Sequence, residues 1–158
     1  MRLLFKQRFF SWFDSYDIYN EQGDIVYIVK GQLSWGHCLH ILDAHQNHIA
    51  TVNEVIFTFL PKFELYIGSE QIGTIQKELT FFRPKYDIEC NGWHIDGDFM
   101  EWDYTISDGC NNTVASVSKQ IFRMTDTYVI DVAEPQDALC ALMVVLAIDA
   151  EKCSRNNG

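Results

Sequence analysis

The fold of this chain is decided by residues 134–148, which read EPQDALCALMVVLAI. Pro135 is typical of a first helical position, where the missing N–H leaves no intrahelical hydrogen bond unmade. Glu134 and Asp137 place negative charge where the helix dipole stabilises it. The stretch therefore predicts a helix over about 135–150.

This helix would be apolar on every side, because nothing in the run 138–148 is more polar than a thiol. A helix without a polar face has to be enclosed. The run covers only about 16 Å at 1.5 Å per residue, whereas a membrane span needs roughly 20 residues. We therefore expect the rest of the chain to form walls around the helix.

The preceding sequence predicts strand after strand, separated by turn residues at a spacing of about 8–12 residues, which is typical of a sandwich or barrel. Asn91-Gly92 is the strongest hairpin signal, because both turn residues need a positive φ. The predicted strands are 2–10, 13–20, 24–31, 37–43, 49–59, 63–67, 71–79, 86–90, 93–97, 102–107, 113–122 and 127–132.

An internal repeat divides these strands into two halves. At a constant offset of 65 residues, similar apolar side chains recur: Ile41 with Ile106, Val52 with Val117, and Phe63 with Tyr128. The spacing is too long for a solenoid unit. It indicates two related half-barrels of about six strands each.

The two patterns together predict a closed barrel of about twelve antiparallel strands around a buried C-terminal helix. Closure removes the exposed strand edges, and the barrel interior encloses the helix. The alternative is a sandwich with the helix on one face, which would leave half of the helix exposed. A chain of 158 residues is one domain by default, so we expect a single domain over 1–151 and a flexible tail over 152–158.

The charge and the cysteines limit the class of protein. A net charge of −10 argues against nucleic-acid binding and against non-specific attraction to anionic lipid. Five cysteines without a C-x-x-C pair indicate reduced thiols rather than a disulfide framework. No signal peptide or spanning segment is visible, so we expect a cytoplasmic protein.

Several short motifs resemble one family: GQLSWG at 31–36, LPKF at 60–63, FFRPKY at 81–86, NGW at 91–93, GDF at 97–99, WDY at 102–104 and VVLAID at 144–149. With them the chain resembles the LURP-one-related family of the Tubby C-terminal-like superfamily, over residues 2–150. The resemblance implies a twelve-stranded barrel around a C-terminal hydrophobic helix.

For function the resemblance implies little. Tubby domains bind phosphoinositides through a few basic side chains, and the related phospholipid scramblases act at membranes. The cysteine-rich stretch, calcium segment and terminal anchor of scramblases are not found in this sequence, so we do not expect scramblase activity. Members of the LURP-one-related family mostly have no assigned biochemical activity.

One candidate site for an anion is the basic grouping Lys62, Lys77, Arg83 and Lys85. If the hairpins bring these side chains together, they would hold a phosphate or a lipid headgroup. The alternative is a set of edge cations that discourage strand-to-strand aggregation.

Two candidate metal sites are visible. His94, Asp96 and Asp98 would share one face of a strand, with Glu101 and Asp103 nearby. The alternative is that these side chains are solvated or satisfy turn amides. Asp43, His45 and His48 carry zinc-binding groups within one turn, but they supply only three local ligands.

Aromatic residues are abundant, and we expect them to fill the core and plug the barrel ends. They are Phe9, Phe10, Trp12, Phe13, Trp35, Phe57, Phe59, Phe81, Phe82, Trp93 and Trp102. The run 9–13 is the place where an exposed patch for a membrane or a partner would lie.

No nucleotide-binding, zinc-protease or serine-hydrolase motif occurs, so we expect neither an enzyme nor a cofactor. The first hypothesis is a non-enzymatic binding or scaffold module for a protein partner. The second is a module that binds phosphoinositide or another anionic ligand at a membrane surface. The third is an enzyme or metal site around residues 94–103.

Overall fold

In the computed structural model of the protein, the described residues are 1–6, 15–32, 34–122 and 125–156. They form twelve strands, one short 3-10 turn and one helix. The strands are β1 (Arg2–Lys6), β2 (Ser15–Tyr19), β3 (Ile25–Gln32), β4 (Cys38–Asp43), β5 (His48–Glu54), β6 (Lys62–Ile67), β7 (Glu70–Lys77), β8 (Tyr86–Glu89), β9 (His94–Asp98), β10 (Asp103–Ser107), β11 (Thr113–Phe122) and β12 (Thr125–Val132).

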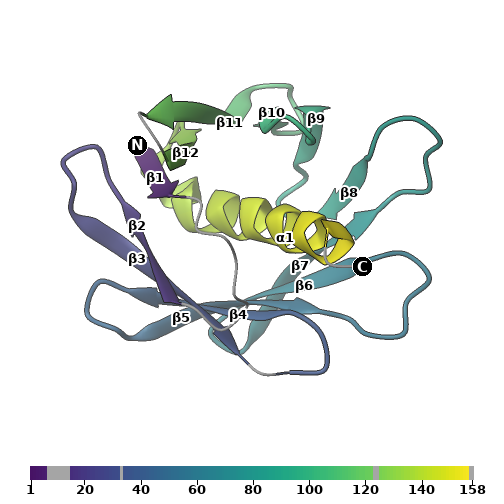
Figure 1. Cartoon of the computed structure of the whole chain (residues 1–158), viewed down its shortest axis with the longest axis horizontal. Coiled ribbons are helices and arrows are strands. Elements are labelled where there is room, and N and C mark those ends of the chain that lie inside the picture. The colour runs from purple at the N-terminus through teal and green to yellow at the C-terminus, as the bar shows by residue number, and fades with distance from the viewer. Residues whose placement is uncertain (7–14, 33, 123–124, 157–158) are drawn as a thin grey trace.

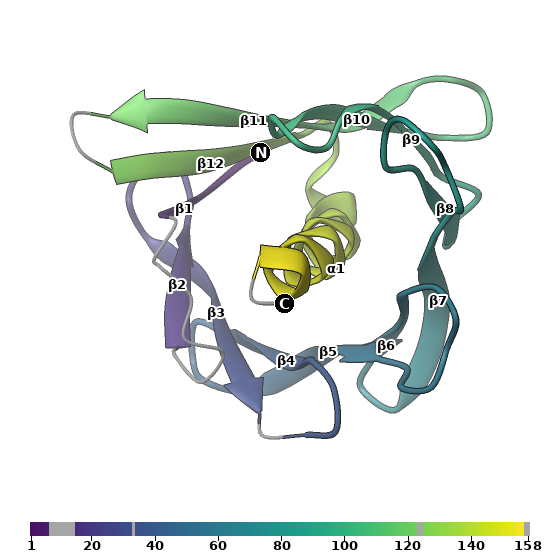
Figure 2. The same cartoon turned by 45° about the vertical axis from the view of Figure 1, so that its right-hand side comes forward.

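The strands form one antiparallel sheet in the order β8-β7-β6-β5-β4-β3-β2-β1-β12-β11-β10-β9. Neighbours in sequence pair with each other except β8 and β9, which are the two ends of the sheet, and β1 pairs with β12, where Leu3 lies opposite Ile130. The sheet curls into a ring around the helix (Figure 2). The predicted mainly β fold is therefore confirmed as a nearly closed barrel with a C-terminal helix.

The helix begins with a 3-10 turn at Pro135–Asp137, with Pro135 at its first position as predicted. Helix α1 then runs over Ala138–Asn156. Every residue from 141 to 151 is buried, which agrees with the absence of a polar face. The helix extends beyond its predicted end near 150, so most of the segment expected to be a flexible tail is helical.

The barrel is open at one boundary, between β8 and β9, which we call the seam. The predicted turn is present: Asn91 and Gly92 have φ of 55° and 67°, and the Trp93 N–H donates to the Cys90 carbonyl at 3.0 Å. The predicted hairpin is nevertheless wrong beyond this turn, because the described strands β8 and β9 pair only with β7 and β10. At Gly97 a Cβ would lie 2.5 Å from the Tyr104 Cα, so this glycine holds β9 close to β10.

The internal repeat is visible in the turns. Asp43 Oδ1 accepts the backbone N–H groups of His45 and Asn47, and Asn47 Nδ2 donates to Asp43 Oδ2. Asp108, 65 residues later, accepts the corresponding three hydrogen bonds in the turn between β10 and β11. The matched apolar residues lie on strands six apart and are all buried: Ile41, Ile106, Val52, Val117, Phe63 and Tyr128.

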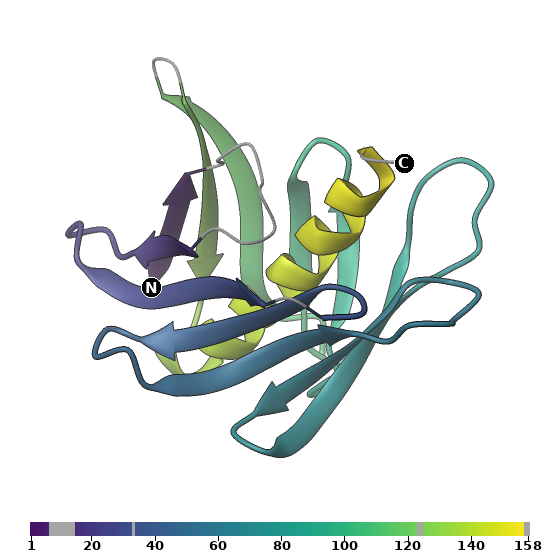
Figure 3. The ribbon, with the colours of Figure 1, turned by 60° about the horizontal axis from the view of Figure 1, so that its bottom comes forward.

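The up-and-down strand order assigns the loops to two ends of the barrel. We call one end the C-terminal rim; its described loops are 34–37, 55–61, 78–85 and 99–102. The end of α1 lies here, because Lys152 Nζ donates to the Phe99 carbonyl at 2.7 Å. In Figures 1 and 3 the β5–β6 and β7–β8 loops extend on the same side as the C-terminus.

Candidate functional site

The C-terminal rim carries large apolar side chains that face water. They are Trp35, Phe57, Phe59, Leu79, Phe81 and Phe82, each at least 73% exposed. The prediction that the aromatic residues fill the core is therefore wrong for Trp35, Phe57, Phe59, Phe81 and Phe82, and confirmed for the buried Trp93 and Trp102. Phe9, Phe10, Trp12 and Phe13 lie outside the described residues.

Local backbone chemistry explains why the aromatics of two loops leave the sheet. The predicted strand 49–59 ends at Glu54, and Phe57 has a left-handed φ of 63°, which a ladder cannot accommodate. Pro61 and Pro84 end the two loops and provide no N–H for strand pairing. Each loop also has an internal bond: the Thr58 hydroxyl donates to the Val55 carbonyl at 3.2 Å, and the Thr80 hydroxyl donates to the Arg83 carbonyl.

The opposite end of the barrel has a different surface. Its described turns are 20–24, 44–47, 68–69, 90–93 and 108–112, which consist mainly of small, polar and acidic residues. The most exposed large apolar residues near that end, Ile25 and Ile67, are strand residues exposed by 39% and 38%. The apolar surface is therefore concentrated at the C-terminal rim.

The structure separates the four basic residues of the predicted anion site. Lys77 Nζ lies 2.7 Å from Glu151 Oε1, and its side chain is only 18% exposed. Lys62 is half-buried on β6. Arg83 and Lys85 are exposed in the β7–β8 loop, the same loop that carries the apolar tips Phe81 and Phe82.

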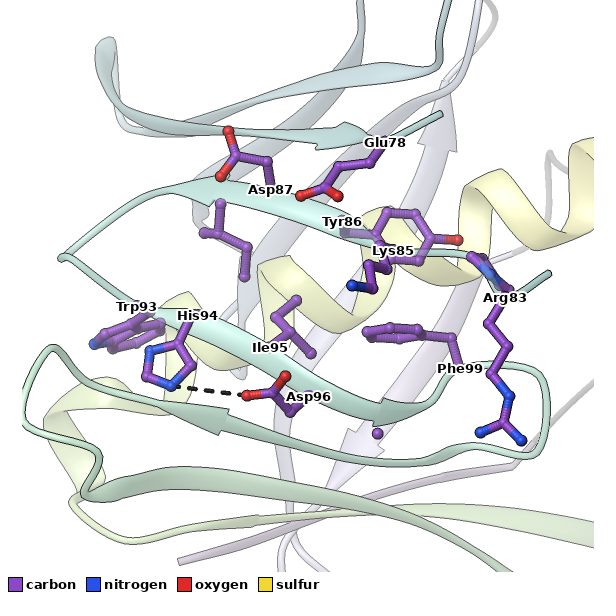
Figure 4. A pocket seen from close by; sticks show the side chains of 13 residues that line it. Glu78, Arg83, Lys85, Tyr86, Asp87, Trp93, His94, Ile95, Asp96 and Phe99 are labelled. Atoms are coloured by element: carbon purple, nitrogen blue, oxygen red, sulfur yellow. Dashed lines mark ion pairs between the residues drawn. The ribbon is translucent and has the colours of Figure 1, made fainter. Parts of the chain in front are cut away.

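Arg83 and Lys85 also line a hollow of about 300 Å³ at the seam. Arg83 lies at one end of it, and Trp93 and His94 lie at the other (Figure 4). The remaining lining residues are Glu78, Pro84, Tyr86, Asp87, Ile88, Ile95, Asp96, Gly97 and Phe99. The hollow therefore combines aromatic walls with charges of both signs and is next to the C-terminal rim.

The acidic candidates make local contacts. His94 Nε2 lies 3.8 Å from the exposed Asp96 Oδ2. Asp98 Oδ1 accepts the N–H groups of Met100 and Glu101 at 3.0 and 3.2 Å. Within the described ranges, no group of three or more histidine, cysteine or acidic residues is arranged to hold a metal ion.

The second metal candidate is likewise engaged in local structure. Asp43 holds its own turn, as described above, and these bonds keep the pKa of its carboxyl below the ordinary value. His45 takes part in that turn through its backbone N–H. His48 lies 2.9 Å from the Thr51 hydroxyl, and its ring packs against that of His40 in a tilted arrangement with centroids 4.6 Å apart.

Sequence reasoning missed a polar group inside the barrel, at the end of α1. Glu151 Oε2 accepts the Tyr86 hydroxyl at 2.5 Å, while Oε1 contacts Lys77. Asp149 is only 4% exposed, and this burial raises its pKa to about 7. In the sequence, Asp149 and Glu151 simply follow the apolar run 138–148, and it is their place within the barrel that shows they are enclosed.

The comparisons with known proteins agree with this architecture. A family model described as LURP-one-related matches residues 1–149. The chain belongs to the LURP-one-related family. The "uncharacterized protein YxjI" of Bacillus subtilis (strain 168) is 29% identical over 150 residues, covering 94% of this chain and 92% of the relative.

A solved structure of the same kind supports the fold of this LURP-one-related protein. An Arabidopsis thaliana protein determined by X-ray crystallography has a TM-score of 0.62 and 16% identity, covering 95% of this chain and 91% of that one. The barrel is consistent with the Tubby C-terminal-like superfamily. In the described part of the chain, no helix is both long and apolar enough to cross a membrane.

Proposed function

We propose that this LURP-one-related protein is a non-enzymatic module that docks its C-terminal rim onto an anionic membrane surface. The observation that supports this is the set of apolar loop tips around Trp35, Phe57, Phe59, Phe81 and Phe82, with Arg83 and Lys85 directly beside them. Apolar side chains on separate loops suit a lipid headgroup region, because each side chain can insert into it independently of the others.

The residue types match those that bind membrane interfaces. Tryptophan and phenylalanine partition into the headgroup region, and lysine and arginine contact anionic lipid. Each basic residue near such a surface contributes about 1 kcal/mol. Arg83 and Lys85 form no ion pair with another described residue, and both are exposed. Their charge is therefore available to a lipid phosphate.

The overall charge of −10 does not oppose this orientation. Exposed charges interact over roughly 8 Å at physiological salt, so the charge nearest the membrane dominates. The four described loops of the C-terminal rim contain two acidic residues, Glu78 and Glu101, and the three loops that carry the exposed aromatic side chains contain Glu78 alone. Asp24, Asp43 and Asp108 lie in turns at the opposite end of the barrel, where they would face away from the lipid.

The seam hollow offers a place for the headgroup. A phosphate in the hollow that Arg83 and Lys85 line would receive charge-assisted hydrogen bonds from either cation, while Phe81 and Phe82 in the same loop enter the interface. A protein partner is the alternative occupant of the apolar tips, and the vesicle experiment below separates it from a membrane.

The test is cosedimentation with vesicles of phosphatidylcholine alone and of phosphatidylcholine with phosphatidylserine, at moderate salt. We expect binding to the anionic vesicles that weakens as salt is raised. Phe81→Ser/Phe82→Ser should reduce the partition coefficient at least tenfold, because each apolar side chain that is removed from water contributes about 1.5–3 kcal/mol.

Arg83→Gln/Lys85→Gln should weaken the anionic binding roughly thirtyfold, from about 1 kcal/mol per cation. Its matched control is Gln22→Glu/Gln71→Glu, which changes the net charge equally at exposed positions far from the C-terminal rim. Equal loss in the control would show a general charge effect. No vesicle binding by the unaltered protein would refute the membrane proposal and leave the rim to a protein partner.

A further inference from the structure

The seam hollow contains charges of both signs that do not pair with each other. Its cations are Arg83 and Lys85, and its carboxylates are Glu78, Asp87 and Asp96. All five side chains are exposed, and the ion pairs of the described residues include none that joins one of these cations to one of these carboxylates. A hollow of about 300 Å³ therefore offers both kinds of charge to a ligand.

The charges lie on both sides of the seam. Lys85 directly precedes β8, whereas Asp96 lies on β9. Figure 4 shows their side chains on the β8 and β9 sides of the hollow, with Arg83 at one end. His94 Nε2 is 3.8 Å from Asp96 Oδ2, which is too distant for a hydrogen bond. The Asp96 carboxylate can therefore accept a hydrogen bond from a ligand.

The backbone at the seam adds neutral hydrogen-bonding groups. In the described chain, β8 pairs with β7 alone and β9 with β10 alone. The outer edge of such a strand presents N–H and C=O groups that no other strand takes. The N–H groups suit a phosphate oxygen, and the C=O groups suit an ammonium. The edges of the seam therefore match the two kinds of charge beside them.

We infer that the seam hollow binds a phosphoester that carries a primary ammonium group, as in phosphoethanolamine and the headgroup of phosphatidylethanolamine. The phosphate accepts hydrogen bonds from Arg83 and Lys85, and the ammonium donates to the carboxylates of Asp87 and Asp96. An anion without the ammonium satisfies only the cations, and the neighbouring carboxylates repel it. A ligand with both charges avoids that repulsion.

The lining residues favour a primary ammonium over a trimethylammonium group. Quaternary ammonium ligands are held by open aromatic faces. Tyr86, Trp93 and Phe99 line the hollow but are only 7%, 6% and 4% exposed, so they form its floor rather than an open cage. The exposed lining groups include carboxylates, which accept hydrogen bonds that a primary ammonium donates and a trimethylammonium group cannot.

This chemistry occurs both in a lipid headgroup and in a free phosphoester. The lipid source rests on the membrane docking proposed above, because the headgroup reaches the hollow only when the C-terminal rim lies on the membrane. The free phosphoester does not require that docking. Two experiments on the full chain separate the sources.

The first experiment uses soluble probes and isothermal titration calorimetry. O-phosphoethanolamine is compared with ethyl phosphate, which lacks the ammonium, and with phosphocholine, whose ammonium cannot donate a hydrogen bond. We expect phosphoethanolamine to bind about tenfold more tightly than either probe, because a hydrogen bond between charged groups contributes at least this factor.

The carboxylates are tested with Asp87→Asn/Asp96→Asn, which should remove the preference for phosphoethanolamine and leave the binding of ethyl phosphate equal or stronger. The matched control is Glu21→Gln/Glu70→Gln, which changes the net charge equally at exposed positions near the opposite end of the barrel. The control should keep the preference. Retention of the preference in a folded Asp87→Asn/Asp96→Asn variant would overturn the assigned roles.

The second experiment is cosedimentation with vesicles that contain the same fraction of phosphatidylglycerol, with either phosphatidylcholine or phosphatidylethanolamine as the remainder. Stronger binding to the phosphatidylethanolamine vesicles, lost in Asp87→Asn/Asp96→Asn, identifies a lipid as the source. A preference among the soluble probes without vesicle binding identifies a free phosphoester and refutes membrane docking.

Equal binding to both kinds of vesicle, with no preference among the soluble probes, overturns this inference and leaves membrane docking intact. The inference is likewise overturned if the unaltered protein binds neither the vesicles nor phosphoethanolamine. The comparison of probes on the unaltered protein decides the question even where a variant does not fold.

Discussion

Lys77 Nζ lies 2.7 Å from Glu151 Oε1, so β7, the strand that pairs with β8 beside the seam, is bonded to the end of the central helix. The Tyr86 hydroxyl adds a second bond to the same carboxylate from β8. Glu151 is 2% exposed and Lys77 18%. These two contacts therefore fix the position of β7 and β8, on one side of the seam, relative to the end of α1.

Removing one partner of this pair should be costly. Glu151→Gln leaves the Lys77 ammonium largely buried without its counter-charge, and we expect a loss of about 3 kcal/mol in the free energy of unfolding. Urea denaturation measures it. The double variant Lys77→Met/Glu151→Gln should recover part of the loss, because no uncompensated charge is then buried. Equal losses in the single and double variants would contradict a coupled pair.

Asp149 should make the protein less stable as the pH rises. Burial raises its pKa from 3.8 to about 7, so the folded protein holds this proton more tightly than the unfolded chain does. The stabilisation is complete below about pH 4 and is lost as the pH rises through 7. A difference of this size corresponds to roughly 4 kcal/mol.

The matched variant is Asp149→Asn, which cannot ionise. Its stability relative to the unaltered protein should rise by about 3 kcal/mol between pH 5 and pH 8, because only the aspartate becomes charged and the rest of the effect falls below pH 5. Urea denaturation of both proteins across this range measures the difference. Parallel pH profiles would show that Asp149 does not titrate in this window.

Replacing a buried leucine of the apolar helix should destabilise the barrel directly. Leu142 is fully buried, and Leu142→Ala should cost about 2–5 kcal/mol through lost contacts and a residual cavity. Leu142→Asp should abolish folding, since a buried unpaired charge costs more still. Thermal melting followed by circular dichroism measures both. An unchanged melting temperature for the aspartate variant would refute the enclosed helix.

The repeated turns should respond alike. Asp43→Ala and Asp108→Ala each remove a carboxylate that accepts the corresponding three hydrogen bonds. We expect similar decreases in melting temperature and additive effects in the double variant, because the two turns lie on different loops. A large effect at one position only would show that the turns are not equivalent.

Trp35 should report contact with a membrane. It is 85% exposed, whereas Trp93 and Trp102 are buried. On addition of anionic vesicles, the fluorescence emission should shift to shorter wavelength, and Trp35→Phe should reduce that shift. A shift of equal size in Trp35→Phe would assign the signal to another tryptophan.

The chain's own pattern predicted the architecture well, because enclosure and repetition are encoded locally. The run 138–148 has no polar face. The apolar residues that recur at an offset of 65 are all buried in the structure. The exposed tips were not predicted, because residues 56–59 read Ile-Phe-Thr-Phe and alternate as a strand would. The left-handed conformation of Phe57, which ends that pattern, cannot be read from residue type.

The seam and the polar group behind it were missed for a different reason. Asn91-Gly92 specifies a turn but does not specify that the flanking strands pair, and β9 instead packs closely on β10 at Gly97. Lys77, Tyr86 and Glu151 are far apart in sequence and meet only because the barrel surrounds the helix. Contacts between residues so far apart in the chain cannot be predicted from residue spacing or composition.

The position of the helix also determines when this protein can fold during synthesis. Strand β1 cannot complete its pairing until β12 has been synthesised. The helix that fills the interior is synthesised after β12. Until α1 has left the ribosome, the apolar inner faces of the strands that precede it have no central partner. A chain that stops before Ala138 would be a sheet without its core, and we expect it to aggregate or be degraded rather than to persist as a shorter domain.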